Sequence, residues 1–338
     1  MHRKSDITKK KMTKQTEILQ IKSSFEDFEE FSKTIQGWGL DYKQMDRGRF
    51  YTDLHQIKTP EVLITEVFFN RRLIQKGNQP PGMRTFAIMA ENAAPFVWRK
   101  QEMTRDRFII FPKNSELDAA SIEGFHVYSI SLAEHVVEEN LHLNGHPALI
   151  AKLKKGGVVD TETAKLQTLG LYLRQVYYQI TQQPELLDRR SFQQRLCDRL
   201  TSCIFDILGC SEDGRVTQLF HRHAQIVQGI ESWLEETDPE YYSVSGLCRT
   251  LSVNERTLRR IVAKWYGVTP QQYLMAIRLN GVRKDLCERL SSNANIYDIA
   301  NCWGFWHMGM FADFYRRQFG ELPSETIMNT SQKSSAGQ

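Results

Sequence analysis

The sequence predicts an α+β protein: a β-rich N-terminal part is followed by helices and then by an all-α C-terminal domain with two helix-turn-helix units. Three observations support this fold class. Short apolar runs separated by turn residues come first, apolar residues at helical spacing follow them, and the last third of the chain contains an internal repeat. The 338 residues also exceed what one hydrophobic core usually organises, so two domains are expected.

The β-rich region is expected from Phe50 to about Ser131. Turn residues at 77–82 and 112–115 interrupt it, and its apolar runs are EVLITEVFF, MRTFAIMA, PFVW, RFIIF and FHVYSIS. This spacing is typical of a compact antiparallel sandwich or barrel. From Leu132 the apolar period becomes helical, which predicts helices over residues 161–180 and 191–208 with the amphipathic pattern of a paired-helix interface.

The small and polar stretch GCSEDG at residues 209–214 predicts a boundary between two domains, which we place at 21–210 and 216–326. The Lys-rich residues 1–20 and the polar residues 327–338 are expected to be disordered tails. No run of about 18 apolar residues is present, and no apolar segment follows the basic start. We therefore expect a soluble, cytoplasmic protein with no membrane partner.

Composition excludes little by itself. The net charge of +4 is compatible with an anionic partner, although ordinary surface lysines produce such an excess. All six cysteines lie in the second half without a CxxC pair, so they are interpreted as thiols in a reducing compartment. No metal-ligand cluster and no GxSxG, HExxH, P-loop or GxGxxG motif occurs, so neither an enzyme nor a cofactor or metal site is predicted.

The repeat in the last third has the plan of a helix-turn-helix. Its copies are SVSGLCRTLSVNERTLRRIVAKWYGVTPQQY and NIYDIANCWGFWHMGMFADFYRRQFGELPSE. Each has a short helix, a turn with an apolar wedge (Val253 or Phe305), a second helix at about 254–266 or 306–319, and a final Gly-x-x-Pro. Apolar spacing holds the second helix from one side, and its free polar face has the form of a helix that enters a DNA major groove.

The segment PQQYLMAIRLNGVRKDLCERL lies between the copies and keeps helical periodicity without an interior proline. It is predicted to be one connecting helix that fixes the separation of the two units. A separation of about one DNA turn, roughly 34 Å, would let one chain insert both second helices on the same face of a duplex.

These residues resemble the AraC/XylS family of regulators over roughly residues 218–326. The resemblance is carried by the repeat, by AIRLNGVRKDL, by WGFWHMGMFADFYRRQFGELPSE and by the two Gly-x-x-Pro stops, in this order. GFWHMGMF and LCRTLSVNERTL look most similar to regulators of ethanolamine-utilisation operons. The resemblance implies a DNA-binding transcription regulator, typically an activator working with RNA polymerase, whose N-terminal part is a cupin-like sensor or dimerisation domain.

The first unit offers five candidate DNA-binding residues. Asn254 is the expected N-cap, and Arg256, Thr257, Arg259 and Arg260 lie in the first half of the reading helix, where the family contacts DNA. An arginine there either donates two hydrogen bonds to guanine or holds a phosphate. The alternative is an ordinary solvated helix face.

The second unit is less polar than its relatives. Its candidate DNA-binding residues are His307, Met308, Gly309, Met310 and Arg316. His307 is a candidate phosphate donor and either methionine a candidate partner of a thymine methyl, with core packing as the alternative for the methionines. Asp313 carries a negative charge where relatives often have arginine, which argues against base reading by this helix.

Other residues receive structural or mixed interpretations. In the connecting helix, Arg283 and Lys284 are candidate phosphate contacts, whereas Arg278 is interpreted as an internal tie. Trp233, Trp265 and Trp303 are expected in the core. Phe96 and Trp98 line a ligand cavity or are packed sandwich aromatics.

Two further hypotheses about the N-terminal domain remain open. A cupin-like metal enzyme fused to a helical domain is disfavoured, because the expected histidine cluster is missing. A domain that only forms a homodimer, or binds another protein, is the second alternative. Resemblance to ethanolamine regulation points to ethanolamine, with or without cobalamin, as the small-molecule effector, and no motif identifies the ligand.

Overall fold

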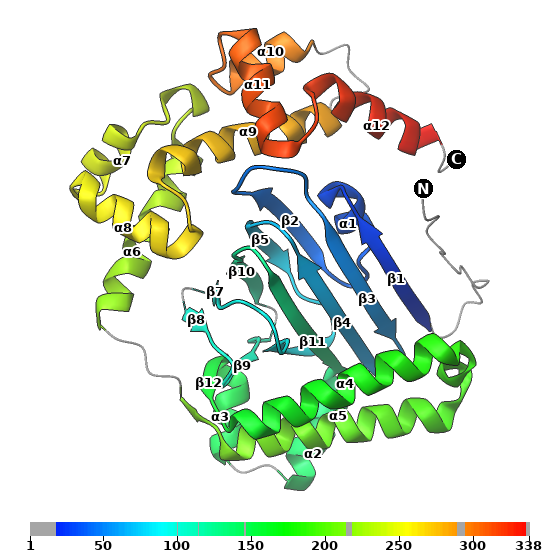
Figure 1. Cartoon of the computed structure of the whole chain (residues 1–338). Helices are drawn as coiled ribbons and strands as arrows, with labels where there is room; N and C mark the ends of the chain where they lie inside the picture. Colours follow the sequence, from blue (N-terminus) through cyan, green and yellow to red (C-terminus); the bar gives the residue numbers. More distant parts are fainter. Residues whose placement is uncertain are drawn as a thin grey trace.

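Two antiparallel β-sheets pack face to face in the first part of the chain. The computed structural model describes residues 18–99, 101–113, 115–144, 147–213, 218–288 and 295–335. The larger sheet has the strand order β1-β3-β4-β11-β6-β9-β12-β13 and the smaller one β2-β5-β10-β7-β8 (Figure 1). The predicted α+β class, with a sandwich before the helices, is confirmed.

The strands of the larger sheet are β1 (Leu19–Phe25), β3 (Thr52–Lys58), β4 (Val62–Phe69), β6 (Met83–Met89), β9 (Arg107–Ile110), β11 (Phe125–Ala133), β12 (Gly157–Asp160) and β13 (Glu212–Asp213). Those of the smaller sheet are β2 (Gly39–Gln44), β5 (Leu73–Asn78), β7 (Phe96–Trp98), β8 (Gln101–Met103) and β10 (Glu116–Ala120).

Alternation and aromatic packing hold the sandwich together. In the centre of the larger sheet, β4 pairs with β11 so that Thr65 lies opposite Ser129 and Phe69 opposite Phe125. The rings of Phe69 and Phe125 stack at a centroid separation of 5.3 Å, and both residues are buried between the sheets. Such pairs add to the area that they bury, and they fix the register of the strands.

The sheets begin earlier than expected. Strands β1 and β2, with helix α1 (Phe28–Thr34) between them, precede the predicted start at Phe50. Their sequences LQIKSSF and GLDYKQ contain few apolar residues because β1 and β2 lie at the edges of their sheets. An edge strand needs less apolar surface, so its sequence signal is weaker.

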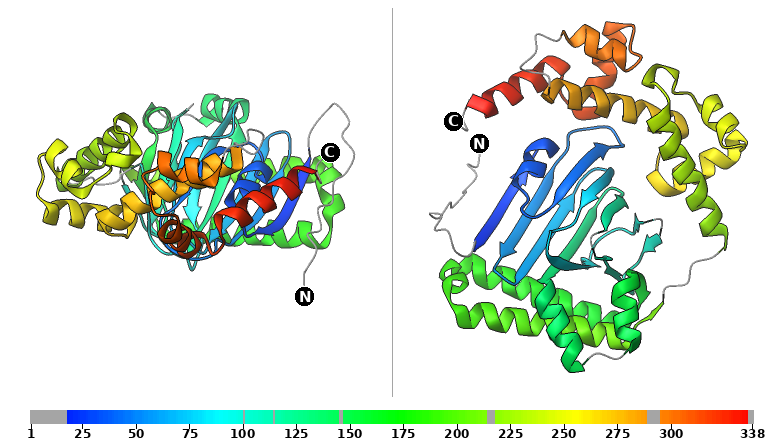
Figure 2. Two further views of the ribbon diagram at one scale, coloured as in Figure 1. Left: turned by 90° about the horizontal axis from the view of Figure 1, so that it is seen from above. Right: turned by 180° about the vertical axis from the view of Figure 1, so that it is seen from behind.

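Helices cover one end of the sandwich. Helices α2 (Glu134–Asn144) and α3 (Pro147–Lys155) precede α4 (Thr163–Gln182), the 3₁₀ turn η1 (Pro184–Asp188) and α5 (Arg190–Cys210). Helices α4 and α5 run side by side at the end of the sandwich that lies away from the C-terminal helices (Figures 1 and 2). The two predicted amphipathic helices are therefore confirmed within two residues at each end.

The C-terminal helices form two helix-turn-helix units on a common frame. The first unit follows α6 (Gln218–Glu236) and η2 (Pro239–Tyr241), and consists of α7 (Val244–Thr250) and α8 (Glu255–Tyr266). The connecting helix is α9 (Pro270–Glu288), and the second unit consists of α10 (Ile296–Cys302) and α11 (Met308–Phe319), followed by α12 (Pro323–Ser335). From above, α9 to α12 lie over the sandwich and α6 to α8 project to one side (Figure 2).

Both expected tails differ from their predictions where they can be compared. Residues 327–335 belong to α12, so disorder was wrong there, because Thr326 and Ile327 on the same helix pack against the core. Residues 19 and 20 belong to β1. Residues 1–17 and 336–338 lie outside the described residues. In the described part of the chain, no helix has the length and apolar character needed to cross a membrane.

A buried seam of amide groups joins the sandwich to the connecting helix. The side chain of Asn280 on α9 accepts a hydrogen bond from the backbone N–H of Gln44 and donates one to its carbonyl, each 2.8 Å long. Gln318 on α11 donates to the same carbonyl (2.8 Å), and its own carbonyl accepts from the Gln44 side chain (2.7 Å). All three side chains are buried, so each would lose a hydrogen bond without replacement if the seam opened.

Arg283 on α9 lies beside this seam. Its side chain is only 5% exposed, donates to both carboxylate oxygens of Glu29, and pairs with Glu321 and with Asp27. The guanidinium also lies over the rings of Phe28 and Phe319. The interpretation of Arg283 as a phosphate contact was therefore wrong, because the sandwich and α12 region enclose it.

The first unit is joined to the sandwich by other contacts. Lys76 pairs with Glu231 at 3.1 Å, and Arg72 donates to the carbonyl of Gly267 at 2.5 Å. Met45 and Ile74 share a hydrophobic cluster with the first unit, whereas the second unit shares the cluster of the sandwich core. The sandwich thus contacts both units directly.

One close helix contact yields a stability prediction. A Cβ atom added to Gly281 on α9 would lie 2.1 Å from the ring of Trp303, whose Nε1 donates to Asp285 at 3.0 Å. We expect Gly281→Ala to lower the free energy of unfolding by about 1–3 kcal/mol, the usual effect of overpacking. Gly170→Ala on α4 is the control, because its Cβ would meet only Ile88 at 3.9 Å. Urea unfolding measures the free energy of unfolding of both variants. Equal stability of both would contradict this contact.

The Arg283 cluster yields a pH prediction. Burial raises the pKa of Glu29 to about 7, against the attraction of Arg283, which lowers it. A carboxyl whose folded pKa exceeds its unfolded value contributes stability below about pH 4.5, and that contribution is lost as the pH rises through 7. We expect the unfolding free energy of the wild type to fall between pH 5 and 8 more steeply than that of Glu29→Gln. The extra fall is at most about 1.4 kcal/mol for each pH unit by which the folded pKa of Glu29 exceeds its unfolded pKa. Parallel pH profiles of the two proteins would refute the assignment.

Candidate nucleic-acid interface

Helix α8 is held from one side and capped at both ends. The Asn254 side chain accepts a hydrogen bond from the Thr257 N–H at 2.8 Å, which confirms it as the N-cap. Gly267 closes the helix in the left-handed conformation, with φ 68°, where a side chain would be strained. Leu258, Ile261, Val262, Trp265 and Tyr266 are buried, so the opposite face is available to a partner.

That opposite face carries Arg256, Arg259 and Arg260, all exposed. Arg259 forms an ion pair with Glu255 one turn before it, at 3.1 Å, so this pair must open or share its charge if Arg259 contacts DNA. Burial lowers the pKa of His223 on α6, and the positive charges of Arg260 and Lys264 lower it further. This shift is a local sign of the positive potential along α8.

Helix α11 packs against its unit in the same way as α8 but exposes different side chains. His307 is its N-cap residue but makes no side-chain capping bond, and Gly320 closes the helix at φ 75°. Met308 is partly buried against the core, which is the alternative raised for it, while Gly309 and Met310 are exposed. Asp313 pairs with Arg317 at 2.7 Å and with Arg316 at 3.8 Å.

The structure also shows where the connecting-helix cations and the three tryptophans lie. Arg278 donates to the carbonyls of Pro239 and Tyr242 at 2.9 and 2.7 Å, so its interpretation as an internal tie is confirmed. Lys284 is exposed and lies 4.0 Å from Glu288. Trp233 and Trp265 are buried as expected, and Trp303 is partly buried and packed against the core.

Sequence reasoning missed the polar residues of the seam. Gln318 occupies the position of the second unit that corresponds to buried Trp265 of the first, and Asn280 lies in the middle of the connecting helix. A glutamine at a core position of a repeat is the one available signal, because buried amides require partners. Gln44, its main partner, lies 274 positions away and carries no such signal.

The sandwich contains a small internal cavity of about 60 Å³. Phe96 and Trp98 line it, as one of their two interpretations predicted, together with Trp38 and Gln75. The Nε1 atoms of Trp38 and Trp98 and the Nε2 atom of Gln75 are buried without a hydrogen-bond partner in the described part of the chain. All three residues line the cavity, and each of these buried N–H groups lacks the acceptor that a buried donor requires.

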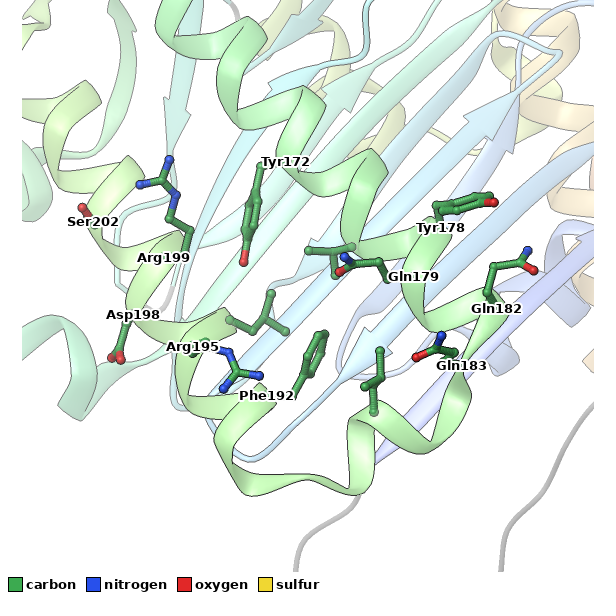
Figure 3. Close-up of a pocket in the computed structure, with 13 residues that line it drawn as sticks. Tyr172, Tyr178, Gln179, Gln182, Gln183, Phe192, Arg195, Asp198, Arg199 and Ser202 are labelled. Carbon is green, nitrogen blue, oxygen red and sulfur yellow. The ribbon is translucent and has the colours of Figure 1, made fainter.

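A larger and more open groove lies on the paired helices. It measures about 980 Å³, and side chains from both helices reach into it, including Tyr172 and Gln179 of α4 and Phe192, Arg195 and Arg199 of α5 (Figure 3). Leu171 and Tyr178 of α4 are also strongly exposed. No group of three His, Cys, Asp or Glu side chains suited to a metal ion occurs among the residues that the structure describes.

Comparison with known proteins concerns mainly the C-terminal helices. A family model described as a helix-turn-helix domain matches residues 247–329, which include α8, α9 and α11. The XylDLEGF operon transcriptional activator of Pseudomonas putida is 27% identical over 135 residues, 40% of this chain and 41% of that protein. The HTH-type transcriptional activator RhaS of Pectobacterium atrosepticum is 33% identical over 99 residues, 29% of this chain and 34% of that protein.

The matched region thus spans about two fifths of the length of the Pseudomonas activator. Among solved structures, ToxT from Vibrio cholerae is similar over 87% of this chain and 98% of that one, with 12% identity and a TM-score of 0.29. A TM-score this low supports no conclusion about the fold or a ligand. Residues 247–329 of this chain match a helix-turn-helix domain, and the chain is similar over part of its length to transcriptional activators of Pseudomonas and Pectobacterium.

Proposed function

We propose that this chain is a sequence-specific DNA-binding transcription regulator whose helices α8 and α11 enter successive major grooves. The observation that carries the proposal is the exposed arginine row of α8, on a helix that is capped at both ends and packed on its other face. The connecting helix α9 has 19 residues and is therefore about 28 Å long, which suits units placed one DNA turn apart.

The geometry ranks the candidate residues. Arg256 and Arg260 are exposed in the first two turns of α8 and are assigned to bases or phosphates. Arg259 is assigned to a phosphate, because its ion pair with Glu255 holds the guanidinium along the surface of the helix. Asn254 and Thr257 lie at the N-terminal end of α8, where the helix dipole favours a phosphate, and they are assigned to one. On α11, His307 and Arg316 are assigned to phosphates, and Met308, Gly309 and Met310 to the groove.

Activation through RNA polymerase is also proposed, because the relatives in Pseudomonas and Pectobacterium are named transcriptional activators. A metal enzyme built on the sandwich remains the alternative function, and a stoichiometrically bound transition metal in the purified protein would favour it.

We propose that a second copy of the chain docks on the paired helices α4 and α5. Support comes from the exposed side chains of Leu171 and Tyr178 and from the groove beside them (Figure 3). A homodimer would place two DNA-binding domains on one operator and raise their combined affinity through effective concentration.

We further propose that a small molecule in the sandwich cavity controls the regulator. At the liquid volume of about 30 Å³ per water the cavity has room for about two waters, which limits the effector to a few non-hydrogen atoms and excludes cobalamin from this position. Its three unpartnered N–H donors favour a neutral molecule with an acceptor, such as a carbonyl compound, over the ammonium group of ethanolamine. The sandwich contacts both helix-turn-helix units, which gives such a ligand a direct route to them.

The arginine assignment is tested by mutation. A pull-down of genomic DNA at two salt concentrations supplies a specific site, because specific complexes survive salt better than electrostatic ones. We expect Arg256→Ala to weaken binding to that site by about 1–3 kcal/mol, and to weaken binding to unrelated DNA much less, if the side chain reads a base.

The matched control is Arg105→Ala, which removes the same charge from an exposed turn between β8 and β9. It should bind the specific site as the wild type does. If Arg256→Ala and the wild type have equal affinity for every duplex, α8 is not the reading helix.

The cavity assignment is tested by thermal unfolding with defined probes. We expect formamide, a neutral carbonyl compound of three non-hydrogen atoms, to raise the unfolding temperature of the wild type. Above its dissociation constant, the shift should grow with the logarithm of the formamide concentration. Gln75→Leu removes one donor and should reduce that shift, whereas Arg190→Ala should not. Stabilisation by ethanolamine or cobalamin, without any by formamide, would overturn the proposed ligand class.

A further inference from the structure

The two reading helices correspond position by position. A shift of 53 residues carries the N-cap Asn254 onto His307 and the left-handed C-cap Gly267 onto Gly320, and both helices have 12 residues. The same shift pairs the buried residues of the two helices: Leu258 with Phe311, Val262 with Tyr315 and Tyr266 with Phe319. Exposed residues related by this shift therefore occupy the same place relative to a bound duplex.

The exposed faces differ in their first two turns. Arg256 corresponds to Gly309, Thr257 to Met310, and Arg260 to Asp313. The sequence of α11 is MGMFADFYRRQF, so its first two turns contain no lysine or arginine. The first cations, Arg316 and Arg317, both pair with Asp313. The N-terminal half of α11 therefore presents almost no hydrogen-bond donor to a groove.

The same half presents apolar surface. The Met310 side chain and the Trp306 side chain, just before the helix, are each 58% exposed. A Cβ atom at Gly309 would meet nothing within 4 Å, so the helix backbone beside Met310 is open to close approach. The only apolar group on a base edge in the major groove is the C5-methyl group of thymine.

We propose that α11 reads thymine methyl groups, with Met310 as the specificity-determining residue and Trp306 as a flanking apolar contact. The inference rests on the proposed DNA-binding function and names the part of the operator that the second unit selects. The occupant of this apolar face is DNA because the face continues, through the repeat, the arginine face of α8, and because the matched helix-turn-helix region includes both helices. The two units then use different chemistry: hydrogen bonding by α8, apolar contact by α11.

Replacement of thymine by uracil tests this inference, because uracil lacks only the methyl group. The full-length protein first selects its preferred site from random duplex DNA, and the half whose sequence preference relaxes in Arg256→Ala is assigned to α8. Each thymine of the site is then replaced singly by uracil. We expect about a fourfold loss of affinity for each contacted methyl in the other half, from the transfer free energy of one such group.

Variants assign the effect to α11. Met310→Ala should bind the thymine and uracil duplexes with equal affinity, Met310→Leu should retain the preference for thymine, and Trp306→Ala should reduce it. Met328→Ala is the control, because Met328 is 54% exposed on α12, and it should keep the fourfold preference. Unfolding temperatures of the four variants, measured beside the wild type, verify that each is folded.

The outcomes separate the two proposals. Selection of a specific site that tolerates uracil at every position overturns the thymine inference and leaves the DNA-binding function intact. An unchanged loss of affinity for uracil in Met310→Ala overturns it as well. If no specific site is selected at all, the proposed function itself fails.

Discussion

The pair of hydrogen bonds between Asn280 and the backbone of Gln44 is the constraint on which the rest of the architecture depends. It fixes the middle of α9 to the end of β2, and Gln318 extends the same seam to α11. Because these amides are buried, the seam cannot slip by one residue without leaving donors and acceptors unpaired. The connecting helix therefore holds both reading helices in one defined relation to the sandwich.

In both units, the residues that pack the second helix against the core are different from the residues that this helix exposes. Left-handed C-cap glycines and buried apolar positions repeat between α8 and α11, so the second helix of each unit packs in the same way. The faces that point away from the core are free to diverge, since they carry no packing constraint. That freedom explains how one helix presents arginines while the other presents a methionine and a carboxylate that two arginines neutralise.

The interior of the sandwich is closely packed except at one cavity. Aromatic packing, such as the stacked rings of Phe69 and Phe125, closes most of its interior, yet one cavity keeps three donors without partners. Unsatisfied buried donors are costly, and Trp38, Trp98 and Gln75, which carry three of them, all line this cavity. The sandwich also shares hydrophobic clusters with both helix-turn-helix units, and Arg283 draws together charges from α1 and from the segment before α12.

The sequence by itself determined the features that depend on local periodicity: the α+β order, the central strands, the paired helices, the repeat and the caps of α8. It also predicted that Arg278 is an internal tie and that α11 is unusually apolar. Only the tertiary structure decided the features that depend on segments far apart. Arg283 has the sequence of an exposed helix cation, but Glu29, 254 positions away, turns it into a buried one.

The same reason explains the other differences. Edge strands β1 and β2 contain few apolar residues and leave a weak pattern, and the mostly polar segment 327–335 is helical because Thr326 and Ile327 anchor its helix to the core. Burial of a polar group is settled by its distant partner, and periodicity reports only neighbours along the chain. The sequence therefore predicted which helices have an exposed face, and the fold decided which of their charges lie on it.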